Sequence, residues 1–373
     1  MASPAGRVDV RRYSRHLLIP EVGLSGQEKL SAARVLVVGA GGLGSPVLAY
    51  LAAAGVGRIG IVDDDAVDVT NLQRQILYRT DDVGKAKAAT AAERLHALNP
   101  QIALDVIPVR LDATNARDIV RLYDVIVDGT DTFGSRYLIN DACVLEGKPD
   151  VYGSIFRFDG QVSIFGAPGG PCYRCMFPEP PPEHLVPNCA EGGVLGVLAG
   201  MVGTWQAAEA LKLVLGIGAP LVGRLALIDA LDARVREVRI ARDPECAVCG
   251  DAPTIRDVAA EPSTRSDAGV TEIDAADIDA VLAADPLATL LDVRDPHEAV
   301  LGAPPGAVSL PTGELDARLH ELDLTRHYIV ACRVGAKSRW AARRLHDAGF
   351  GEVRHVRDGL LAYALIDGTF DVF

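Results

Sequence analysis

One glycine-rich segment, Gly39-Ala-Gly-Gly-Leu-Gly44, limits the possible folds of this chain more than any other part of the sequence. It follows Arg34 to Gly39, which has the composition of a buried strand, and it opens a predicted helix from Leu43 to Ala54. Glycines let the backbone approach a phosphate, and the helix N-terminus supplies N–H donors and a positive dipole. The segment therefore predicts a nucleotide site, with a tight turn that binds nothing as the alternative.

Strand and helix patterns alternate along the first half of the chain. We expect further strands at Arg58–Asp63, Ile102–Val109 and Asp124–Asp128, and a helix at Lys85–Leu98. This alternation predicts an α/β fold that is Rossmann-like and doubly wound, with a mostly parallel sheet. Val151–Phe165 instead has the pattern of a hairpin that turns at Asp159-Gly160, so the sheet is expected to be mixed.

The 373 residues are expected to form two domains. Residues 1–251 form the nucleotide-binding domain, the small and polar residues 252–270 a linker, and residues 271–373 a smaller α/β domain. An apolar fraction of 49% excludes a disordered chain, and a formal net charge of −13 argues against a nucleic-acid partner.

No membrane segment is expected. The N-terminus has no apolar signal core, and the apolar segment Gly192–Ala208 is short and Gly-rich, which favours a buried core helix. Pro178–Pro187 is too rich in proline for a helix and is expected to cross the surface as an extended segment. We expect a soluble, cytoplasmic protein.

Charged residues follow the glycine-rich segment in an order that suits nucleotidyl transfer. Asp63 ends the next predicted strand, where a carboxylate can hold ribose hydroxyls. Arg74 and Lys87 can neutralise the charge that spreads over the α-phosphate and pyrophosphate, a need that a nicotinamide enzyme does not have. Asp131, in Asp128-Gly-Thr-Asp131, is placed to hold Mg²⁺ on the phosphates. For any one of these residues a solvated surface charge is the alternative.

Together these motifs resemble the ThiF/MoeB family of ubiquitin-activating-type adenylyltransferases. The resemblance runs from about Arg11 to Gly250 and includes GAGGLG, NLQRQ, DGTD and Arg12-Tyr-Ser-Arg15. It implies that ATP and Mg²⁺ are used to adenylate the C-terminal glycine of a ubiquitin-like sulfur-carrier protein ending in Gly-Gly. It also implies a homodimer in which Arg15 reaches into the other protomer's site.

The same resemblance assigns the residues of the nucleotide site. Those expected to bind ATP are Gly39, Gly41, Gly42, Gly44, Asp63, Asp65, Thr70, Asn71, Leu72, Gln73, Arg74, Lys87, Asp131 and Thr132. Those expected to take part in catalysis are Arg15, Arg74, Lys87 and Asp131, together with two cysteines, Cys189 and Cys332.

Four of the seven cysteines form two C-x-x-C pairs, Cys172 with Cys175 and Cys246 with Cys249. Four thiolates in two such pairs suit a tetrahedral structural Zn²⁺, although the long gap between the pairs leaves a redox pair open on spacing alone. The family resemblance implies zinc at these four residues.

The remaining cysteines have different surroundings. Cys189 precedes an expected helix, where the thiol pKa is lowered and the thiolate can attack an acyl-adenylate; an ordinary small buried residue is the alternative. Members of the resembled family differ in whether they use this position. Cys143, inside a helix-like stretch, is expected to pack in the core.

The C-terminal segment resembles a rhodanese domain at Leu290–Arg294, Pro305–Pro311 and Ile329–Ser338. The resemblance implies that Cys332 accepts sulfane sulfur from a persulfide or thiosulfate donor. N–H groups of the loop from Arg333 to Lys337 would stabilise the thiolate, and both cations would add positive charge. Two sequence details qualify this. Ser338 stands where a thiol phosphatase needs arginine, and Gly302-Ala-Pro-Pro305 replaces the usual Gly-His-Ile.

The two domains together resemble the MoeZ-like group of adenylyltransferase–rhodanese fusions. They predict adenylation of the carrier and then sulfur transfer that yields a carrier thiocarboxylate. The alternative is adenylation alone, with a rhodanese domain that is inert or only binds the carrier. The sequence also leaves open a scaffold that binds the carrier without turnover, and a dehydrogenase; the intact Arg74, Lys87 and Asp131 argue against the scaffold.

Overall fold

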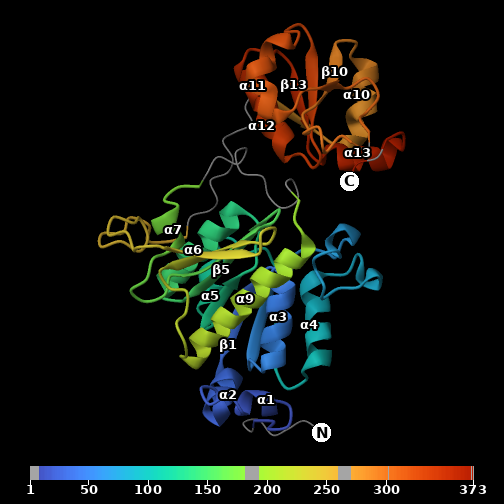
Figure 1. Cartoon of the computed structure of the whole chain (residues 1–373). Coiled ribbons are helices and arrows are strands. Elements are labelled where there is room, and N and C mark those ends of the chain that lie inside the picture. The colour runs from blue at the N-terminus through green and yellow to red at the C-terminus, as the bar shows by residue number, and fades with distance from the viewer. Residues whose placement is uncertain (1–7, 181–192, 259–269, 301, 371, 373) are drawn as a thin grey trace. The chain divides into compact units, whose positions relative to one another are not determined.

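The computed structural model describes residues 8–180, 193–258, 270–300, 302–370 and 372 (Figure 1). The described residues fall into two compact units, 8–180 with 193–258 and 270–372. Each unit is an α/β structure with its own sheet and its own hydrophobic core.

The first unit is built on an eight-stranded sheet in the order β3-β2-β1-β4-β5-β6-β7-β8. The first five strands in this order are parallel, and β5 to β8 form antiparallel pairs, so the doubly wound, mixed sheet is confirmed. Its strands are β1 (Arg34–Val38), β2 (Arg58–Val62), β3 (Ala103–Ile107), β4 (Val125–Asp128), β5 (Asp150–Phe156), β6 (Asp159–Phe165), β7 (Arg224–Asp229) and β8 (Arg234–Arg239).

Helices cover both faces of this sheet. On one face α3 and α9 lie side by side, as Figure 1 shows. On the other face α6 packs on β4 and β5, with α5 beside it. The helices are α1 (Ser14–Leu17), α2 (Gly23–Ala32), α3 (Gly44–Ala54), α4 (Lys87–Leu98), α5 (Ala116–Val120), α6 (Phe133–Glu146), α7 (Tyr173–Met176) and α9 (Gly196–Leu215), with the 3₁₀ helices η1 (Val69–Asn71) and η2 (Thr80–Asp82). Two apolar clusters fill the two sides of the sheet, and Cys143 is buried in one of them, as predicted.

The predicted hairpin is confirmed, but its turn lies two residues earlier than predicted. Phe156 pairs with Asp159, so Arg157 and Phe158 make the turn, and Arg157 adopts a φ of 52°. Gly160 lies within β6, where an added Cβ would come within 2.6 Å of a methyl group of Val202 on α9. This glycine therefore serves helix packing rather than the turn.

The apolar segment before Glu209 forms a core helix, as predicted, over its described part from Gly196 onward. Leu198, Ala199 and Val202 of α9 are fully buried against the sheet. Among the described residues no helix is long and apolar enough to cross a membrane. The predicted extended crossing lies mostly outside the described residues, since the description stops at Pro180 and resumes at Gly193.

The start of the predicted linker packs on the first unit. The Ile255 N–H donates to the Ala247 carbonyl, the Asp257 carboxylate pairs with Arg117 at 3.1 Å, and Val258 is buried in the core beside α5 and α6. Composition alone suggested a linker from residue 252, but the side chains of Ile255 and Val258 pack against the core of the first unit.

The second unit has a five-stranded parallel sheet in the order β11-β10-β12-β13-β9. Its strands are β9 (Val270–Ile273), β10 (Ala288–Asp292), β11 (Val308–Ser309), β12 (His327–Ala331) and β13 (Val353–Val356). Its helices are α10 (Ile278–Ala284), α11 (Leu315–Arg318), α12 (Ala336–Asp347) and α13 (Gly359–Asp367), with short 3₁₀ turns η4 (Ala275–Asp277), η5 (Thr312–Glu314) and η6 (Leu319–Glu321).

Candidate functional site

The glycine-rich segment forms the turn between β1 and α3, next to the end of β4. Gly39 has a φ of +90°, and an added Cβ would lie 2.9 Å from the Gly129 carbonyl oxygen. A Cβ on Gly44 would overlap the Gly39 carbonyl. The turn therefore needs glycine at both ends, and it leaves backbone exposed at the carboxyl edge of the parallel strands.

A cavity of about 350 Å³ opens at this edge. Nine of the predicted residues line it together: Gly39, Gly41, Gly42, Asp63, Asp65, Arg74, Lys87, Asp131 and Thr132. They come from loops that follow β1, β2 and β4 and from the start of α4, so the strand ends bring distant parts of the sequence to one place.

Asp63 fastens the glycine-rich turn to the end of β2. Its carboxylate accepts hydrogen bonds from the Ala40 N–H at 2.8 Å and the Asp65 N–H at 2.9 Å. Burial raises the pKa of the Asp63 carboxyl above its usual range, while these N–H groups and Lys87 act in the opposite direction. Lys87 is nearly buried, and its Nζ lies 2.8 Å from the exposed Asp65 carboxylate. Lys87 thus points its charge toward the acidic side of the cavity.

Arg74 and Asp131 line the cavity from two different loops. Arg74 Nη1 donates to the Thr70 carbonyl at 3.1 Å, and its side chain lies against Gly42. Asp131 is exposed, and among the described residues it makes no ion pair or hydrogen bond, so its oxygens are available to a cation. Thr132 caps α6 by accepting a hydrogen bond from the Ser135 N–H at 3.3 Å.

Several predicted residues lie outside the cavity lining. Gly44 is buried in the first turn of α3, and Thr70, Asn71, Leu72 and Gln73 form or follow η1, which Asp68 caps through the Thr70 N–H at 2.8 Å. Arg15 is exposed on α1, which lies at the opposite end of the first unit from the carboxyl edge (Figure 1).

Some lining residues were not predicted from the sequence, among them Asp64, Gln75, Val109, Arg110, Leu111, Ser135 and Arg136. Gln75 completes the NLQRQ motif, so that motif was a usable signal for it. Arg136 is buried on α6, with its guanidinium 5.1 Å from the Phe133 ring centroid. No local pattern marks Val109 to Leu111, which reach the cavity only because β3 pairs with β2.

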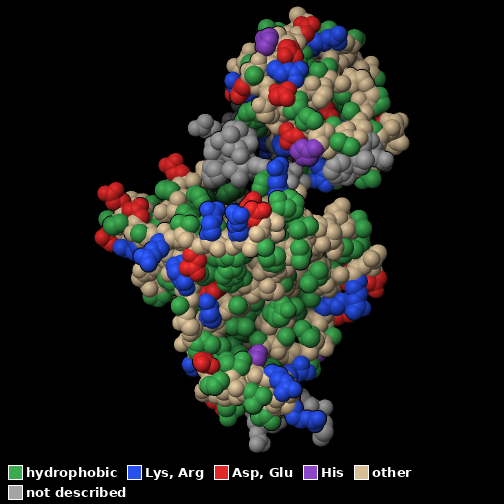
Figure 2. Space-filling model, in the orientation of Figure 1, with side chains coloured by type: hydrophobic (Ala, Val, Ile, Leu, Met, Phe, Trp, Pro, Cys, Tyr) green, Lys and Arg blue, Asp and Glu red, His purple; other side chains and the backbone are tan. Residues whose placement is uncertain are grey.

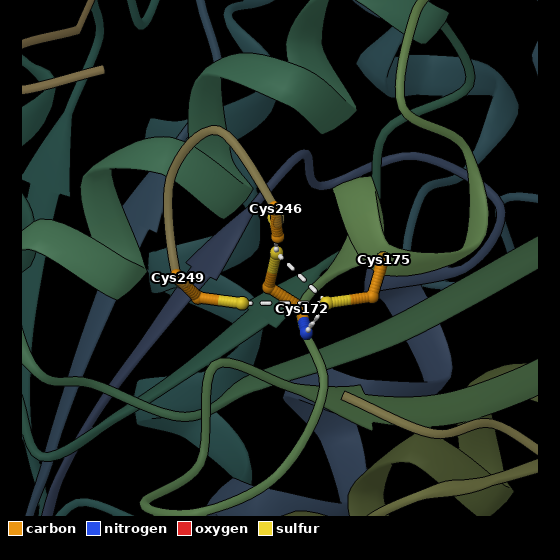
Figure 3. A group of neighbouring side chains, drawn as sticks. All are labelled: Cys172, Cys175, Cys246 and Cys249. Carbon is orange, nitrogen blue, oxygen red and sulfur yellow. Dashed lines mark hydrogen bonds between the residues drawn. The ribbon is translucent and has the colours of Figure 1, made fainter. Parts of the chain in front are cut away.

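The four C-x-x-C cysteines meet in one cluster (Figure 3). The Sγ separations are 3.5 Å for Cys172–Cys246, 3.3 Å for Cys175–Cys249 and 3.9 Å for Cys172–Cys175, and all four atoms lie within 4.8 Å of one another. Four sulfurs at about 2.3 Å from a tetrahedral Zn²⁺ would be about 3.8 Å apart. The cluster therefore has the composition and approximate size of a structural zinc site.

The surroundings of these thiols affect their ionisation in different ways, and hydrogen bonds lower the pKa of Cys246 against the opposing effect of burial. Burial raises the pKa of the Cys172 thiol well above its usual range, and burial with the hydrogen bond to Cys175 raises the pKa of Cys249 to about 12. Such buried sulfurs become thiolates when a metal supplies positive charge. The Arg242 guanidinium donates to the Cys249 carbonyl at 2.6 Å and fixes the second loop.

Cys332 directly follows β12 in the second unit and is almost fully buried. Its Sγ accepts N–H hydrogen bonds from Gly335 at 3.2 Å and Ser338 at 3.3 Å. Gly335 has a φ of +96°, and a Cβ there would overlap the Arg357 carbonyl. The loop thus directs backbone N–H groups at the sulfur, as predicted, and such an arrangement stabilises a thiolate.

Lys337 was predicted to add positive charge near Cys332, but in the structure it is paired with two carboxylates. Its Nζ lies 2.8 Å from Glu298 and 3.0 Å from Asp295, which neutralise its charge. The unusual Gly302 segment is fastened by Arg294, which is fully buried, pairs with Asp292 and donates to the Gly302 carbonyl at 3.0 Å. Cys189 lies outside the described residues.

A parallel sheet whose first strand leads through a glycine turn into a helix, with acidic and basic residues around a cavity at the strand ends, defines a nucleotide-binding α/β protein. The chain belongs to the ThiF family, whose sequence model matches residues 13–248. The model of the rhodanese-like domain matches residues 274–365.

Curated relatives cover one or both units. A sulfur carrier protein adenylyltransferase of Thermus thermophilus is 56% identical over 67% of this chain and 94% of its own length. A probable adenylyltransferase/sulfurtransferase MoeZ of Mycobacterium tuberculosis is 44% identical over 97% of this chain and 95% of its own. The adenylyltransferase and sulfurtransferase MOCS3 of Bos taurus is 40% identical over 98% and 88%.

Solved structures agree on the fold. The crystal structure of E. coli MccB with succinimide superimposes with a TM-score of 0.57 at 24% identity, covering 65% of this chain and 75% of that one. At this identity the likeness shows the fold of the first unit alone.

Proposed function

We propose that this chain adenylates the C-terminal glycine of a ubiquitin-like sulfur-carrier protein and then converts it to a thiocarboxylate through a persulfide on Cys332. The observation that carries this is the cavity that brings the glycine turn, Asp63, Arg74, Lys87 and Asp131 together. The relatives that cover both units are named adenylyltransferases and sulfurtransferases, which supports both halves of the reaction.

In the first half-reaction, the carrier carboxylate attacks the α-phosphate of ATP. A carboxylate–phosphorus bond forms, the bond to the β-phosphate oxygen breaks, and pyrophosphate leaves. Arg74 and Lys87 offset the negative charge that develops, and the turn after β1 holds phosphate oxygens with its N–H groups. Asp63 orients the ribose. Mg²⁺, held by Asp131, would neutralise phosphate charge when bound.

In the second half-reaction, the terminal sulfur of a Cys332 persulfide attacks the acyl-adenylate carbon and AMP leaves, which gives an acyl disulfide. A second thiolate then attacks the Cys332 sulfur and releases the thiocarboxylate, and the resulting disulfide is reduced by an external thiol. We propose Cys189 as that second thiolate. The Gly335 and Ser338 N–H groups stabilise the Cys332 thiolate before it is loaded with sulfur.

Several features of the assembly belong to the same proposal. The four-cysteine cluster holds Zn²⁺, and the protein is a homodimer in which Arg15 of one protomer enters the site of the other. None of the six cysteines that the structure describes is in a disulfide, which fits a reducing compartment, and we place the protein in the cytoplasm. Basic and acidic side chains are interspersed on the face seen in Figure 2, which suits a protein partner better than a nucleic acid.

Two assays test the proposal and separate its alternatives. We expect the chain to catalyse ATP–pyrophosphate exchange only when a purified carrier protein ending in Gly-Gly is present. If no such carrier supports exchange, the chain would be a scaffold that binds the carrier without turnover. Mass spectrometry of the carrier, after a persulfide donor is added, should then show one carboxylate oxygen replaced by sulfur. Exchange without this product would support the adenylation-only alternative.

A further inference from the structure

A buried arginine lines the nucleotide cavity and has no carboxylate partner. Arg136 of α6 is 7% exposed, and it belongs to the cavity wall. Among the residues that the structure describes, it forms no ion pair. A guanidinium stays charged at every pH at which the protein is folded, so its burial is costly unless an anion compensates for it. An unpaired, buried charge in the wall of a cavity therefore points to an anionic ligand.

The groups that hold Arg136 in place are neutral. Its Nη2 donates a hydrogen bond to the Ser154 hydroxyl of β5 at 2.9 Å. The guanidinium carbon lies 5.1 Å from the Phe133 ring centroid and 5.5 Å from the Tyr152 ring centroid. Its Nε has no hydrogen-bond partner among the described residues. These contacts restrict the position of the guanidinium but leave its charge without a counter-ion.

The alternative is that Arg136 serves only to compensate for the buried carboxylate of Asp128. Asp128 does act on Arg136 through its charge. However, Asp128 Oδ1 accepts from the Thr130 N–H at 2.8 Å and from the Thr130 hydroxyl at 2.6 Å, and Asp128 Oδ2 has no partner among the described residues. Asp128 is therefore held by its own turn rather than by the guanidinium, and this alternative does not explain why Arg136 lines the cavity.

Both substrates of the proposed reaction are anionic, and the position of Arg136 favours one of them. The other cations lie with the loops after β1 and β2: Arg74 lies against the glycine turn, and Lys87 pairs with the loop after β2. Arg136 lies on α6, which packs on β4 and β5, and these strands are on the far side of β1 from β2. It thus lines a part of the cavity that the two other cations do not reach.

We propose that Arg136 binds the C-terminal carboxylate of the carrier, an inference that deepens the proposed function and rests on it. In adenylation this carboxylate has to approach the phosphates of ATP, which repel it. A guanidinium beside the carboxylate offsets the repulsion and can orient both of its oxygens through forked N–H groups. Arg136 therefore distinguishes a carrier with a free C-terminus from one whose C-terminus is blocked.

The binding of two peptides tests this recognition without any assay of activity. The probes are a synthetic peptide with the C-terminal sequence of a carrier, ending in Gly-Gly, and the same peptide as its C-terminal amide. A non-hydrolysable ATP analogue is bound first, so that Arg74 and Lys87 already have their phosphates. The wild-type chain should prefer the acid by about 10–10²-fold, the range for hydrogen bonds to charged groups. Arg136→Met should bind both peptides equally.

A wild-type chain that binds the acid and the amide equally would overturn the proposal, and so would an acid preference that Arg136→Met retains. The matched control is Arg157→Met, which removes an exposed arginine that lies 5.2 Å from the Phe156 ring centroid and outside the cavity lining. This control should keep the acid preference of the wild type.

The kinetics of pyrophosphate exchange separate Arg136 from the residues that bind phosphate. Arg136→Met should lower kcat/KM for the carrier by about 10–10²-fold, while the affinity for ATP stays that of the wild type. An equal loss of affinity for ATP would show that Arg136 holds a phosphate, and would refute the assignment.

A second variant covers the case in which Arg136→Met does not fold. Arg136→Lys keeps the charge but lacks the forked N–H groups, so its acid preference should be several-fold smaller than that of the wild type. An undiminished preference in this variant would count against the proposal. If no carrier supports exchange by the wild type, yet an acid preference that depends on Arg136 is found, the proposed function fails and the carboxylate site stands.

Discussion

The turn after β1 and the turn after β12 each lie at the carboxyl end of a strand that has a parallel neighbour on both sides, one in each sheet. Each follows a parallel strand, contains a glycine whose Cβ would overlap a carbonyl oxygen, and leads into a helix, α3 or α12. Around the first turn the structure has an open cavity with Arg74, Lys87 and Asp131. Around the second it has a buried sulfur that already accepts two backbone N–H groups.

The difference shows how one backbone device serves two kinds of chemistry. N–H groups at a strand-to-helix turn stabilise whatever negative charge is placed there. In the first unit the negative charge belongs to a nucleotide that has to bind, so the site needs a cavity to hold the nucleotide and cationic side chains to neutralise its phosphates. In the second unit the chain supplies the charged atom itself, and the one lysine of the loop that was expected to help is neutralised by Asp295 and Glu298.

Replacement of Cys332 by alanine should produce the largest effect and separate the two turns. Sulfur transfer from a persulfide donor should fall by at least about 10³-fold, because the nucleophile is gone. Pyrophosphate exchange should be unchanged, and free sulfide should restore some thiocarboxylate by attacking the adenylate directly. Thiocarboxylate formed at the wild-type rate from the persulfide donor would show that the second unit is not the sulfur source.

Arg74→Ala or Asp131→Ala should have the opposite effect to Cys332→Ala: adenylation should be lost while sulfur loading is kept. Loss of one group that stabilises charge on the phosphates should slow exchange by about 10²–10³-fold, while sulfur loading of Cys332 without ATP continues. Melting temperature should change little, since both side chains face the cavity. Arg236→Ala, on the exposed strand β8, is the matched control and should exchange normally. Near-normal exchange in either cavity variant would contradict the assignment.

Cys189→Ala should affect only the passage between the two reactions. Pyrophosphate exchange and sulfur loading of Cys332 should each persist, because neither needs a second thiolate, whereas carrier thiocarboxylate should form several-fold more slowly. Mass spectrometry of the wild-type chain with carrier, ATP and donor should trap a disulfide at Cys189 before reductant is added. A variant that forms thiocarboxylate at the wild-type rate would remove Cys189 from the mechanism.

Removal of zinc should weaken the first unit and leave the second intact. Structural Zn²⁺ binds zinc-finger peptides with about 10–16 kcal/mol, and even a part of that energy would matter for a domain of this size. A chelator should lower the melting temperature of the first unit by roughly 10 °C, on the scale of about 2–4 °C per kcal/mol. Metal analysis should show one zinc per chain, and freshly purified protein without zinc would exclude the site.

Lys337→Met should have the smallest effect. It leaves the buried Glu298 carboxylate without its cation, which should destabilise the second unit by about 1–3 kcal/mol. Sulfur loading should fall only a few-fold, because the N–H groups that face Cys332 come from the backbone. Arg326→Met, at an exposed position in the same unit, controls for loss of charge. A loss as large as that of Cys332→Ala would show that the lysine acts on the sulfur itself.

Local patterns in the sequence predicted much of the fold. The alternation of apolar runs predicted the parallel strands, and the glycine turn predicted the site at their ends, because both depend on neighbours in sequence. Where a glycine had two possible uses the pattern failed: Gly160 suggested the hairpin turn, yet it serves contact with Val202 of α9. Composition also placed Val258 in a linker, although it packs in the first unit's core.

The sequence by itself determined which chemical groups the chain possesses, the two cysteine pairs among them. It also determined which groups follow a strand: the glycine turn, Asp63, Asp131 and Cys332. Only the tertiary structure decided which groups share a space. Strand order brought Val109, Arg110 and Leu111 to the cavity, helix packing buried Arg136 beside it, and loop folding placed two carboxylates on Lys337. Burial and proximity between residues that are distant in sequence depend on the packing of the whole domain rather than on any local pattern.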